Sequence, residues 1–383
     1  GDVTKQGNKD ANGIGDFYYP VPSGYKALCS VNLPPTVSSV IRPQRHFNTV
    51  LYTGNGGTSQ TISGIEFKPD LIWFKGLNHT AAFVWLDSVR GVTKNLRSNS
   101  NAQEGTTTAF LTSFNEDGFT VGQSGTTNGS GETNIAYCWK GGGAAVSNSD
   151  GTITTSISAN QEAGFSIVTY TGTGSAATIG HGLGKVPKLV ITKLRDTTTQ
   201  DWFMNFGEIT GDRGKYVKLN STNAEVSETT VYPNTASTST VYSVGTDNSV
   251  NGSGSSYVAY CWSEVPGYSK FGTYEGVDDG DGPYVYLGFR PAFLFIRRRQ
   301  GEDTVLFDTK TQTRNEIGQS GRIYLDLDNS QGGTTKDMDF HSSGFKLRKN
   351  TGIVNDGAGT FMYMAIAEKP DLTPYNAVPT AKS

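Results

Sequence analysis

Charge and cysteine are both scarce in this sequence. Only 17% of its 383 residues are charged, and a net charge of −3 leaves no basic surface of the kind that nucleic-acid binding requires. Three cysteines, Cys29, Cys138 and Cys261, are too few for a disulfide scaffold. No apolar run approaches the roughly 18–20 residues of a membrane-spanning helix. We therefore expect no nucleic-acid partner and no membrane insertion.

Glycine, in contrast, is abundant. The 48 glycines follow no Gly-X-Y period, which excludes collagen. Aromatic residues make up 11% of the chain, more than a disordered protein carries. Glycine, serine, threonine and asparagine are poor residues for helix interiors, whereas threonine, valine, tyrosine and phenylalanine suit strands. The composition predicts an all-β protein with many turns.

An internal repeat gives the predicted domain organisation. Four landmarks recur in order, separated by 118 or 123 residues between the first and second copies and by 104 between the second and third. The first is a Tyr-x-Gly turn, at Tyr52, Tyr170 and Tyr274, and the second is a proline that opens an apolar run, at Pro69, Pro187 and Pro291. The third is an asparagine turn, at Asn128, Asn251 and Asn355, and the fourth is a closing apolar strand, at 135–139, 258–262 and 362–366. A copy of about 100 residues is the size of a β-sandwich. We predict three tandem β-sandwich-like repeats.

The landmarks also set the predicted boundaries. We expect an extended connector or the end of a preceding domain at residues 1–46, and three repeats at 47–140, 164–265 and 266–369. A linker with a hairpin turn at Asp150-Gly151 is expected over residues 141–163, and a C-terminal tail over 370–383. Cys138 and Cys261 occupy the same position in different repeats, so each is expected to be a buried, unpaired thiol in its own core.

Several of these runs resemble the repeated β domain of marine bacteriophage tail fibre-like proteins. The resemblance is carried by residues 165–174, 179–184, 186–191 and 259–262, and in the first repeat by 87–91 and 114–122. Residues 17–29 are similar to the closing segment of a SPRY or concanavalin-like domain. This resemblance implies a virion structural or host-binding role, often as a homotrimer, and it supplies no catalytic motif. The third repeat departs from the pattern, with Glu275, Ala365 and Ile366 in place of Thr171, Cys261 and Trp262.

Enzyme signatures are sparse. The chain has no G-x-S-x-G, H-E-x-x-H, P-loop or C-x-x-C motif. Asp87, Glu104 and Asp308 are the carboxylates we considered for glycoside cleavage, which needs two carboxyl groups about 5–9.5 Å apart, but nothing in their spacing singles them out. The basic run 297–299 and the acidic loop 278–282 are both expected to be solvated turns, and the four histidines (His46, His79, His181 and His341) are expected in loops. We expect no catalytic residue, no metal and no cofactor.

Sugar binding is the chemistry that this composition favours. Glycan sites combine an exposed aromatic ring with nearby amide and carboxylate groups. The repeat offsets place Trp85, Phe203 and Phe307 at one position, which we expect on the buried face of the strand. We therefore predict that Trp202 points to an accessible face and binds ligand together with Gln200, Asp201 and Asn205. The alternative is that both faces of this strand are covered.

The sequence as a whole indicates a virion protein, a tail fibre or related appendage that attaches to a glycan or protein receptor on the host surface. The alternatives are a purely structural spacer or decoration protein of the virion, a polysaccharide-degrading tailspike enzyme, and a secreted adhesin. The expected partners are two further copies of the chain and other virion tail proteins. Three repeats could instead pack around a pseudo-threefold axis within one chain.

Overall fold

The computed structural model describes residues 7–10, 13–22, 27, 42–196, 199–312, 315, 321–332 and 337–368. The chain divides into two compact units, Gly1–Val40 and Ile41–Ser383. In the first, an antiparallel bridge joins Asn8 to Phe17, and the carboxylate of Asp10 accepts hydrogen bonds from the backbone of Ile14 and Ala27. The predicted tail (370–383) and Cys29 lie outside the described residues.

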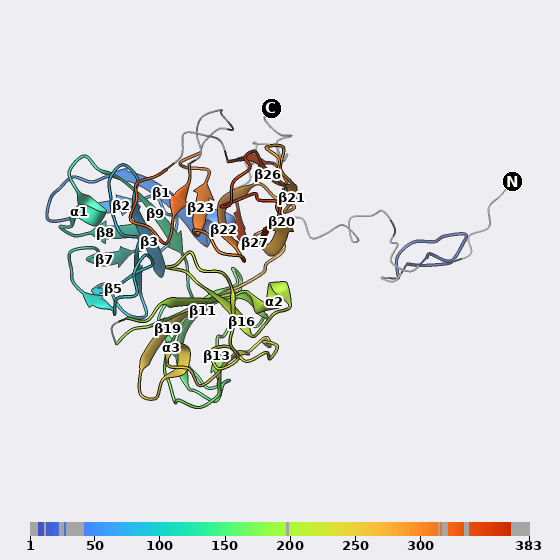
Figure 1. The fold of residues 1–383 in the computed structure, drawn as a ribbon, viewed down its shortest axis with the longest axis horizontal. Helices are drawn as coiled ribbons and strands as arrows, with labels where there is room; N and C mark the ends of the chain where they lie inside the picture. The colour runs from blue at the N-terminus through green and yellow to red at the C-terminus, as the bar shows by residue number, and fades with distance from the viewer. Residues whose placement is uncertain are drawn as a thin grey trace. The chain divides into compact units, whose positions relative to one another are not determined.

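The second unit is all-β, as predicted, and its strands pair in antiparallel sheets. We divide it into segment 1 (Phe47–Trp139), segment 2 (Val146–Ser263) and segment 3 (Ser269–Ala367), which run from blue through green and yellow to red in Figure 1. Helices are limited to a 3-10 turn and, among the described residues, three α-helices of four residues each, far short of a bilayer's thickness: η1 (Pro43–Arg45), α1 (Gly125–Asn128), α2 (Gly207–Thr210) and α3 (Asn248–Asn251).

Segment 1 contains a six-stranded main sheet and a three-stranded small sheet. The main sheet has the order β1 (Phe47–Thr53), β9 (Thr133–Trp139), β3 (Leu71–Gly76), β4 (Val84–Asp87), β5 (Lys94–Arg97), β6 (Gly105–Thr106). The small sheet has the order β2 (Gln60–Ser63), β8 (Gly118–Val121), β7 (Ser113–Asn115).

Segment 2 has an eight-stranded main sheet and a two-stranded small sheet. The main sheet has the order β10 (Val146–Asn148), β11 (Thr155–Asn160), β12 (Phe165–Thr171), β19 (Ser256–Ser263), β14 (Pro187–Leu194), β15 (Trp202–Asn205), β16 (Lys215–Lys218), β17 (Val226–Ser227). The small sheet pairs β13 (Ala177–Gly180) with β18 (Val241–Val244). β10 and β11 pair antiparallel on either side of Asp150-Gly151, where a hairpin turn was predicted.

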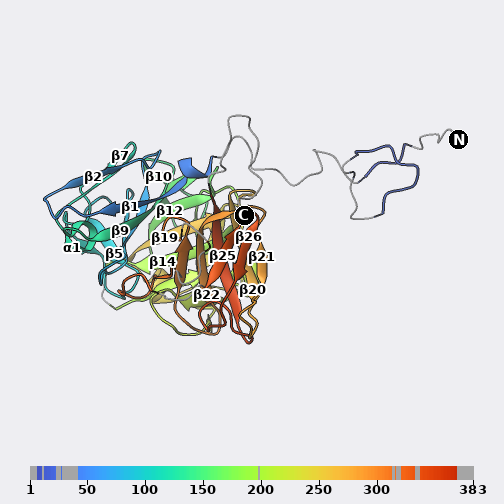
Figure 2. The same ribbon diagram turned by 90° about the horizontal axis from the view of Figure 1, so that it is seen from above.

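Segment 3 has a five-stranded main sheet and a three-stranded small sheet. The main sheet has the order β20 (Ser269–Glu275), β27 (Thr360–Ala367), β22 (Pro291–Arg298), β23 (Val305–Asp308), β24 (Ile323–Tyr324). The small sheet has the order β21 (Tyr284–Tyr286), β26 (Gly344–Leu347), β25 (Met338–His341). β20, β21, β25 and β26 lie together on one side of this segment in Figure 2.

The landmarks of the sequence repeat make the same contacts in each segment. The hydroxyl of the landmark tyrosine donates to a backbone carbonyl 75–80 residues away: Tyr52 to Thr127, Tyr170 to Val250 and Tyr274 to Val354. The landmark glycine lies against backbone, so a Cβ there would meet a carbonyl oxygen at 2.2–2.3 Å: Gly54, Gly172 and Gly276. The landmark asparagine accepts a hydrogen bond from the residue after that glycine: Asn128, Asn251 and Asn355. These landmarks are therefore structural.

Each segment has a core between its two sheets, and a fourth core is shared by all three segments. Cys138 and Cys261 lie in the separate cores of segments 1 and 2 and are unpaired, as predicted. The shared core draws side chains from the opposite face of every main sheet, including Trp73, Trp139, Trp262 and Phe293. The three main sheets therefore cover one another through a common apolar centre.

The segments contact one another in a cyclic pattern. At the end of each proline-initiated strand a buried cation donates to a backbone carbonyl of a neighbouring segment: Lys75 to Leu327, Lys193 to Asn101 and Arg297 to Asn223. Segment 1 thus reaches segment 3, segment 3 reaches segment 2, and segment 2 reaches segment 1. Arg297 is fully buried, so the expectation of a solvated basic turn is wrong for this residue; Arg299 pairs with Asp212 and Glu225 of segment 2.

One register prediction is wrong. Trp85, Phe203 and Phe307 are all buried, but Trp85 faces the shared core while Phe203 and Phe307 face the cores of their own segments. Strand pairing gives the reason: Trp73 pairs with Trp85, Ile191 with Met204 and Phe295 with Leu306. The two residues of these pairs are 12 positions apart in segment 1, 13 in segment 2 and 11 in segment 3. A shift of one residue moves a side chain to the other face of its strand.

Candidate functional site

Three of the four side chains predicted to bind ligand on segment 2 are engaged within the protein. Trp202 is 0% exposed, its indole nitrogen donates to the carbonyl of Arg97, and its ring lies 4.8 Å from that of Trp85. The prediction that Trp202 is accessible is wrong, because both faces of its strand are covered. Three neighbours form polar contacts within segment 2: the backbone carbonyl of Gln200 accepts from Lys193, the carboxylate of Asp201 pairs with Lys218, and the side-chain amide of Asn205 donates to the carbonyls of Arg213 and Lys215.

The three carboxylates that could serve glycoside cleavage instead form hydrogen bonds and ion pairs within the protein. Asp87 and Glu104 both pair with Arg90, at 2.5 and 3.0 Å, and Glu104 also pairs with Arg195 of segment 2. Burial acts to raise the pKa of Glu104, but the hydrogen bond from Arg195 and the charge of Arg90 outweigh it and lower this pKa. Asp308 lies at a different junction, where Tyr137 and Thr311 donate to it, and burial raises its pKa.

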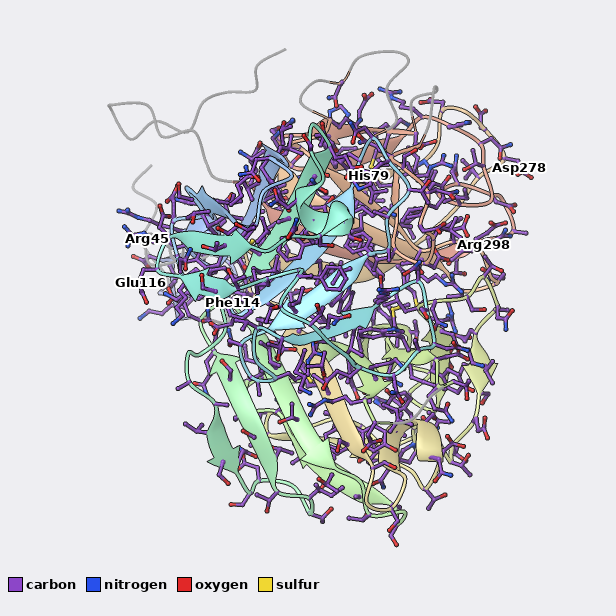
Figure 3. All side chains as sticks on the ribbon, turned by 90° about the vertical axis from the view of Figure 1, so that its left-hand side faces the viewer. Arg45, His79, Phe114, Glu116, Asp278 and Arg298 are labelled. Atoms are coloured by element: carbon purple, nitrogen blue, oxygen red, sulfur yellow. The ribbon has the colours of Figure 1, made fainter. Side chains whose placement is uncertain are left out.

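The histidines and the acidic loop offer no metal site. His46, His79 and His181 lie in loops or turns as predicted, whereas His341 ends strand β25. Figure 3 shows His79 in segment 1 and Asp278 at the outer side of segment 3. In the acidic loop, Asp278 accepts from Gly357, Asp279 accepts from Asp281, and Asp281 pairs with Lys346. Among the described residues, no three histidine, cysteine or acidic side chains come together as ligands.

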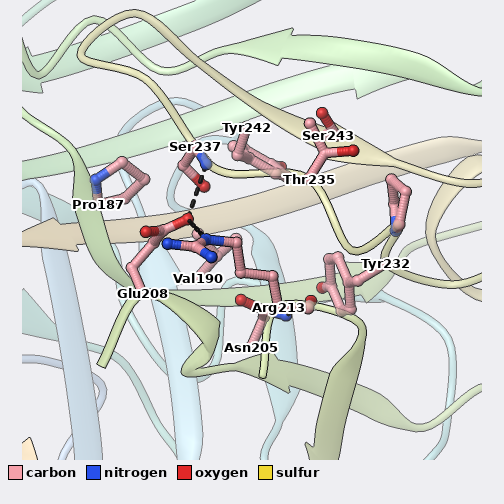
Figure 4. Close-up of a pocket in the computed structure, with 11 residues that line it drawn as sticks. Pro187, Val190, Asn205, Glu208, Arg213, Tyr232, Thr235, Ser237, Tyr242 and Ser243 are labelled. Carbon is pink, nitrogen blue, oxygen red and sulfur yellow. Dashed lines mark hydrogen bonds and ion pairs between the residues drawn. The ribbon is translucent and has the colours of Figure 1, made fainter. Parts of the chain in front are cut away.

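A small pocket in segment 2 is lined by self-paired polar groups. It lies between the main sheet and the small sheet, with Asn205, Tyr232 and Tyr242 in its wall (Figure 4). The carboxylate of Glu208 accepts from Arg213 at 2.8 Å and from the backbone of Ser237 at 2.7 Å. Because these partners already satisfy its charged group, the pocket presents little free chemistry to a ligand.

Segment 3 carries the best candidate for a binding surface. Tyr284 and Tyr286 are 44% and 63% exposed, and they are the only strongly exposed aromatic side chains among the described residues of the second unit. Both come from β21, the edge strand of the small sheet, where alternation buries Val285 and turns the two tyrosines outward. Edge strand β21 thus presents two aromatic rings on one face.

The register of the small sheet assembles polar groups beside these rings. Across the sheet, Tyr284 of β21 pairs with Lys346 of β26, which in turn pairs with Asp339 of β25. Likewise Tyr286 pairs with Gly344, which in turn pairs with His341. Gly344 leaves room for Tyr284, whose hydroxyl reaches Ser343 Oγ at 2.7 Å and whose ring meets that of His341 edge-on at 5.6 Å. We call this surface the tyrosine face: Tyr284, Tyr286, Asp339, His341, Ser343 and Lys346.

Charged side chains surround the tyrosine face. Asp281 pairs with Lys346 at 2.9 Å and with Arg348 at 3.4 Å, and Arg348 also pairs with Asp339 at 2.6 Å. The hydrogen bond from Lys346 lowers the pKa of Asp281. On the other side, Lys270 of β20 places its ammonium 5.4 Å from the centre of the Tyr286 ring. The surface therefore combines apolar rings with donors and acceptors.

The corresponding sheets of segments 1 and 2 lack these rings. The buried pairs Ile62–Phe119, Ile179–Tyr242 and Val285–Phe345 align the three sheets. In this alignment Tyr284 corresponds to Thr61 and Thr178, and Tyr286 corresponds to Ser63 and Gly180. The sequence showed that the third repeat departs from the pattern, and comparing β21 with its counterparts could have located this surface.

The fold and surface define an all-β protein built around a shared core, with an aromatic face on its third segment. Residues 42–370 match the model of a family described as "Domain of unknown function (DUF7483)", and the chain belongs to this family.

No curated protein matches the chain. A solved structure titled "Crystal Structure of the STIV MCP" is similar at 9% identity, over 60% of this chain and 92% of that chain. The TM-score of 0.18 is too low for this likeness to carry any argument.

Proposed function

We propose that this protein is a surface-attachment module that binds glycan through the tyrosine face. The observation that carries the proposal is the exposure of Tyr284 and Tyr286 on one face of β21, while the aromatic residues of the described core are buried. Aromatic rings cover the apolar faces of sugars, and carboxylate, imidazole, hydroxyl and ammonium groups bind sugar hydroxyls. His341, Ser343 and Lys346 place such groups beside the rings, while the carboxylate of Asp339 is buried and pairs with Arg348.

The proposed setting is a virion appendage. The resemblance of residues 165–174, 179–184, 186–191 and 259–262 to repeated domains of tail fibre-like proteins supports this setting, and the proposed assembly is a homotrimer with other tail proteins as partners. Three copies of one tyrosine face would add avidity to weak single contacts. A host-surface glycan is then the receptor in the proposal.

The test is a glycan array probed with the full chain and a matched variant. In the variant, Tyr284→Thr and Tyr286→Ser install the residues that segment 1 carries at the same sheet positions, which its own small sheet accommodates. We expect the wild-type chain to bind a defined set of glycans, and the variant to lose about ten-fold or more in affinity at an unchanged thermal midpoint. Equal binding by both proteins would refute the tyrosine face as the site.

Two readouts separate the alternatives. A spacer or decoration protein would bind neither the array nor host cells. A depolymerase would release reducing ends from host polysaccharide. For an attachment protein we expect glycan binding without the release of reducing ends.

A further inference from the structure

We infer that the glycan bound at the tyrosine face is acidic, and that Lys270 binds its carboxylate or sulfate group. This inference rests on the proposed function and specifies its ligand class. It is carried by the position of one ammonium group relative to Tyr286 and to the ion pairs around it.

Lys270 is held at the border of the face by Tyr286. Its Nζ donates to the carbonyl of Tyr286 at 3.1 Å and lies 5.4 Å from the centre of the ring. Lys270 comes from β20, the edge strand of the main sheet, so its side chain bridges the two sheets at the end where Tyr286 is exposed. An ammonium group has three N–H donors, and the carbonyl of Tyr286 occupies one of them. The positive charge of the group also faces the ring of Tyr286.

The other two cations in or beside the tyrosine face are each paired with a carboxylate. Lys346 pairs with Asp281, and Arg348 pairs with both Asp281 and Asp339. Among the described residues, no carboxylate lies within 4.0 Å of Lys270 Nζ, so this is the cation of the face that lacks a counterion. Among the ion pairs of the described residues, Lys346 and Arg348 are matched by Asp281 and Asp339, whereas Lys270 has no carboxylate partner.

An anionic sugar supplies what this arrangement lacks. Its ring would lie against Tyr286 while its carboxylate or sulfate accepts charge-assisted hydrogen bonds from the ammonium, which are stronger than those between neutral groups. A neutral glycan would contact the ring of Tyr286, and the ammonium of Lys270 would remain hydrated. The geometry therefore favours uronate-containing or sulfated chains over neutral ones.

The experiment compares wild-type chain with Lys270→Gln and with Lys185→Gln. Lys185 is an exposed lysine of segment 2, so its variant controls for the loss of one positive charge. All three are applied to an array of neutral, uronate-containing and sulfated glycans, and the best acidic glycan is then titrated beside its carboxyl-reduced or desulfated counterpart. We expect acidic glycans to dominate the bound set and Lys270→Gln to weaken them about ten-fold, with the neutral counterpart bound equally by all three proteins.

The outcomes distinguish this inference from the function on which it rests. If the bound glycans are neutral, or if Lys270→Gln binds acidic glycans as tightly as Lys185→Gln does, the inference is overturned and the glycan-binding function stands. If no glycan of any class binds, both are overturned. Loss of binding on carboxyl reduction indicates a uronate, and loss on desulfation indicates a sulfate ester.

Discussion

The hydroxyl of Tyr260 in segment 2 donates a 2.7 Å hydrogen bond to the carboxylate of Asp87 in segment 1. Tyr137 of segment 1 makes the same contact with Asp308 of segment 3, at 2.8 Å. At the third junction the corresponding positions are Met364 and Phe206, both in the shared apolar core. At these equivalent positions two of the three junctions therefore carry a buried polar pair, and the third carries two apolar side chains.

The Tyr260–Asp87 pair is expected to stabilise the fold measurably. Tyr260→Phe removes the hydroxyl and leaves Asp87 paired with Arg90 alone, in a site without water access. A buried hydrogen bond to a charged group contributes about 1.5–3 kcal/mol, so the free energy of unfolding in urea should fall by about that amount. Tyr284→Phe, on the exposed face, is the control and should leave this free energy unchanged. An unchanged value for Tyr260→Phe would show that the junction does not depend on the pair.

Trp202 is expected to matter for stability and to have no direct part in ligand binding. Trp202→Ala opens a cavity in the shared core and removes the hydrogen bond to Arg97, so unfolding should become easier by about 3–5 kcal/mol. Trp202→Phe retains most of the apolar volume and should cost less. The measurements are urea unfolding, and glycan affinity at a urea concentration at which the variants remain folded. Weakened affinity in folded Trp202→Phe would restore the original prediction of a site there.

The sequence predicted the all-β class because composition and alternation depend on local chemistry. It also predicted the buried state of Cys138 and Cys261, since equivalent positions in a repeat share an environment. It did not predict the faces of Trp85 and Trp202, because loops that differ by one residue shift the register between segments. Offsets taken from distant landmarks cannot detect such a shift.

The shared core and the tyrosine face were not predicted from the sequence, for different reasons. The shared core requires contacts between residues more than a hundred positions apart, such as Trp202 with Arg97, which no local pattern encodes. The tyrosine face depends on an edge strand of three residues, too short to give a clear periodic signal.

The two thiols of the cores are expected to be inert in the folded protein. Burial raises the pKa of Cys138 and of Cys261 and leaves both without access to solvent. In a Cys29→Ser variant, which retains only these two cysteines, a thiol-specific chromogenic reagent should label neither within minutes in buffer and both in urea. Rapid labelling in buffer would show that a core opens locally far more often than this packing implies.

Asp326 is expected to make the protein less stable as the pH rises from about 4 to 7. Burial is the main cause that raises its pKa to about 7 from 3.8, and the nearby charge of Asp303 adds to it. Between these two values the folded chain holds a proton that the unfolded chain has lost, so the free energy of unfolding falls across this window and the full penalty remains above it. Asp326→Asn keeps an acceptor for the backbone of Thr304 and should raise this free energy by about 1–3 kcal/mol at pH 8, with little gain at pH 4. Glu116→Gln, at an exposed carboxylate, is the control for urea unfolding at both pH values; a gain for Asp326→Asn that is equal at pH 4 and pH 8 would contradict the titration of this group.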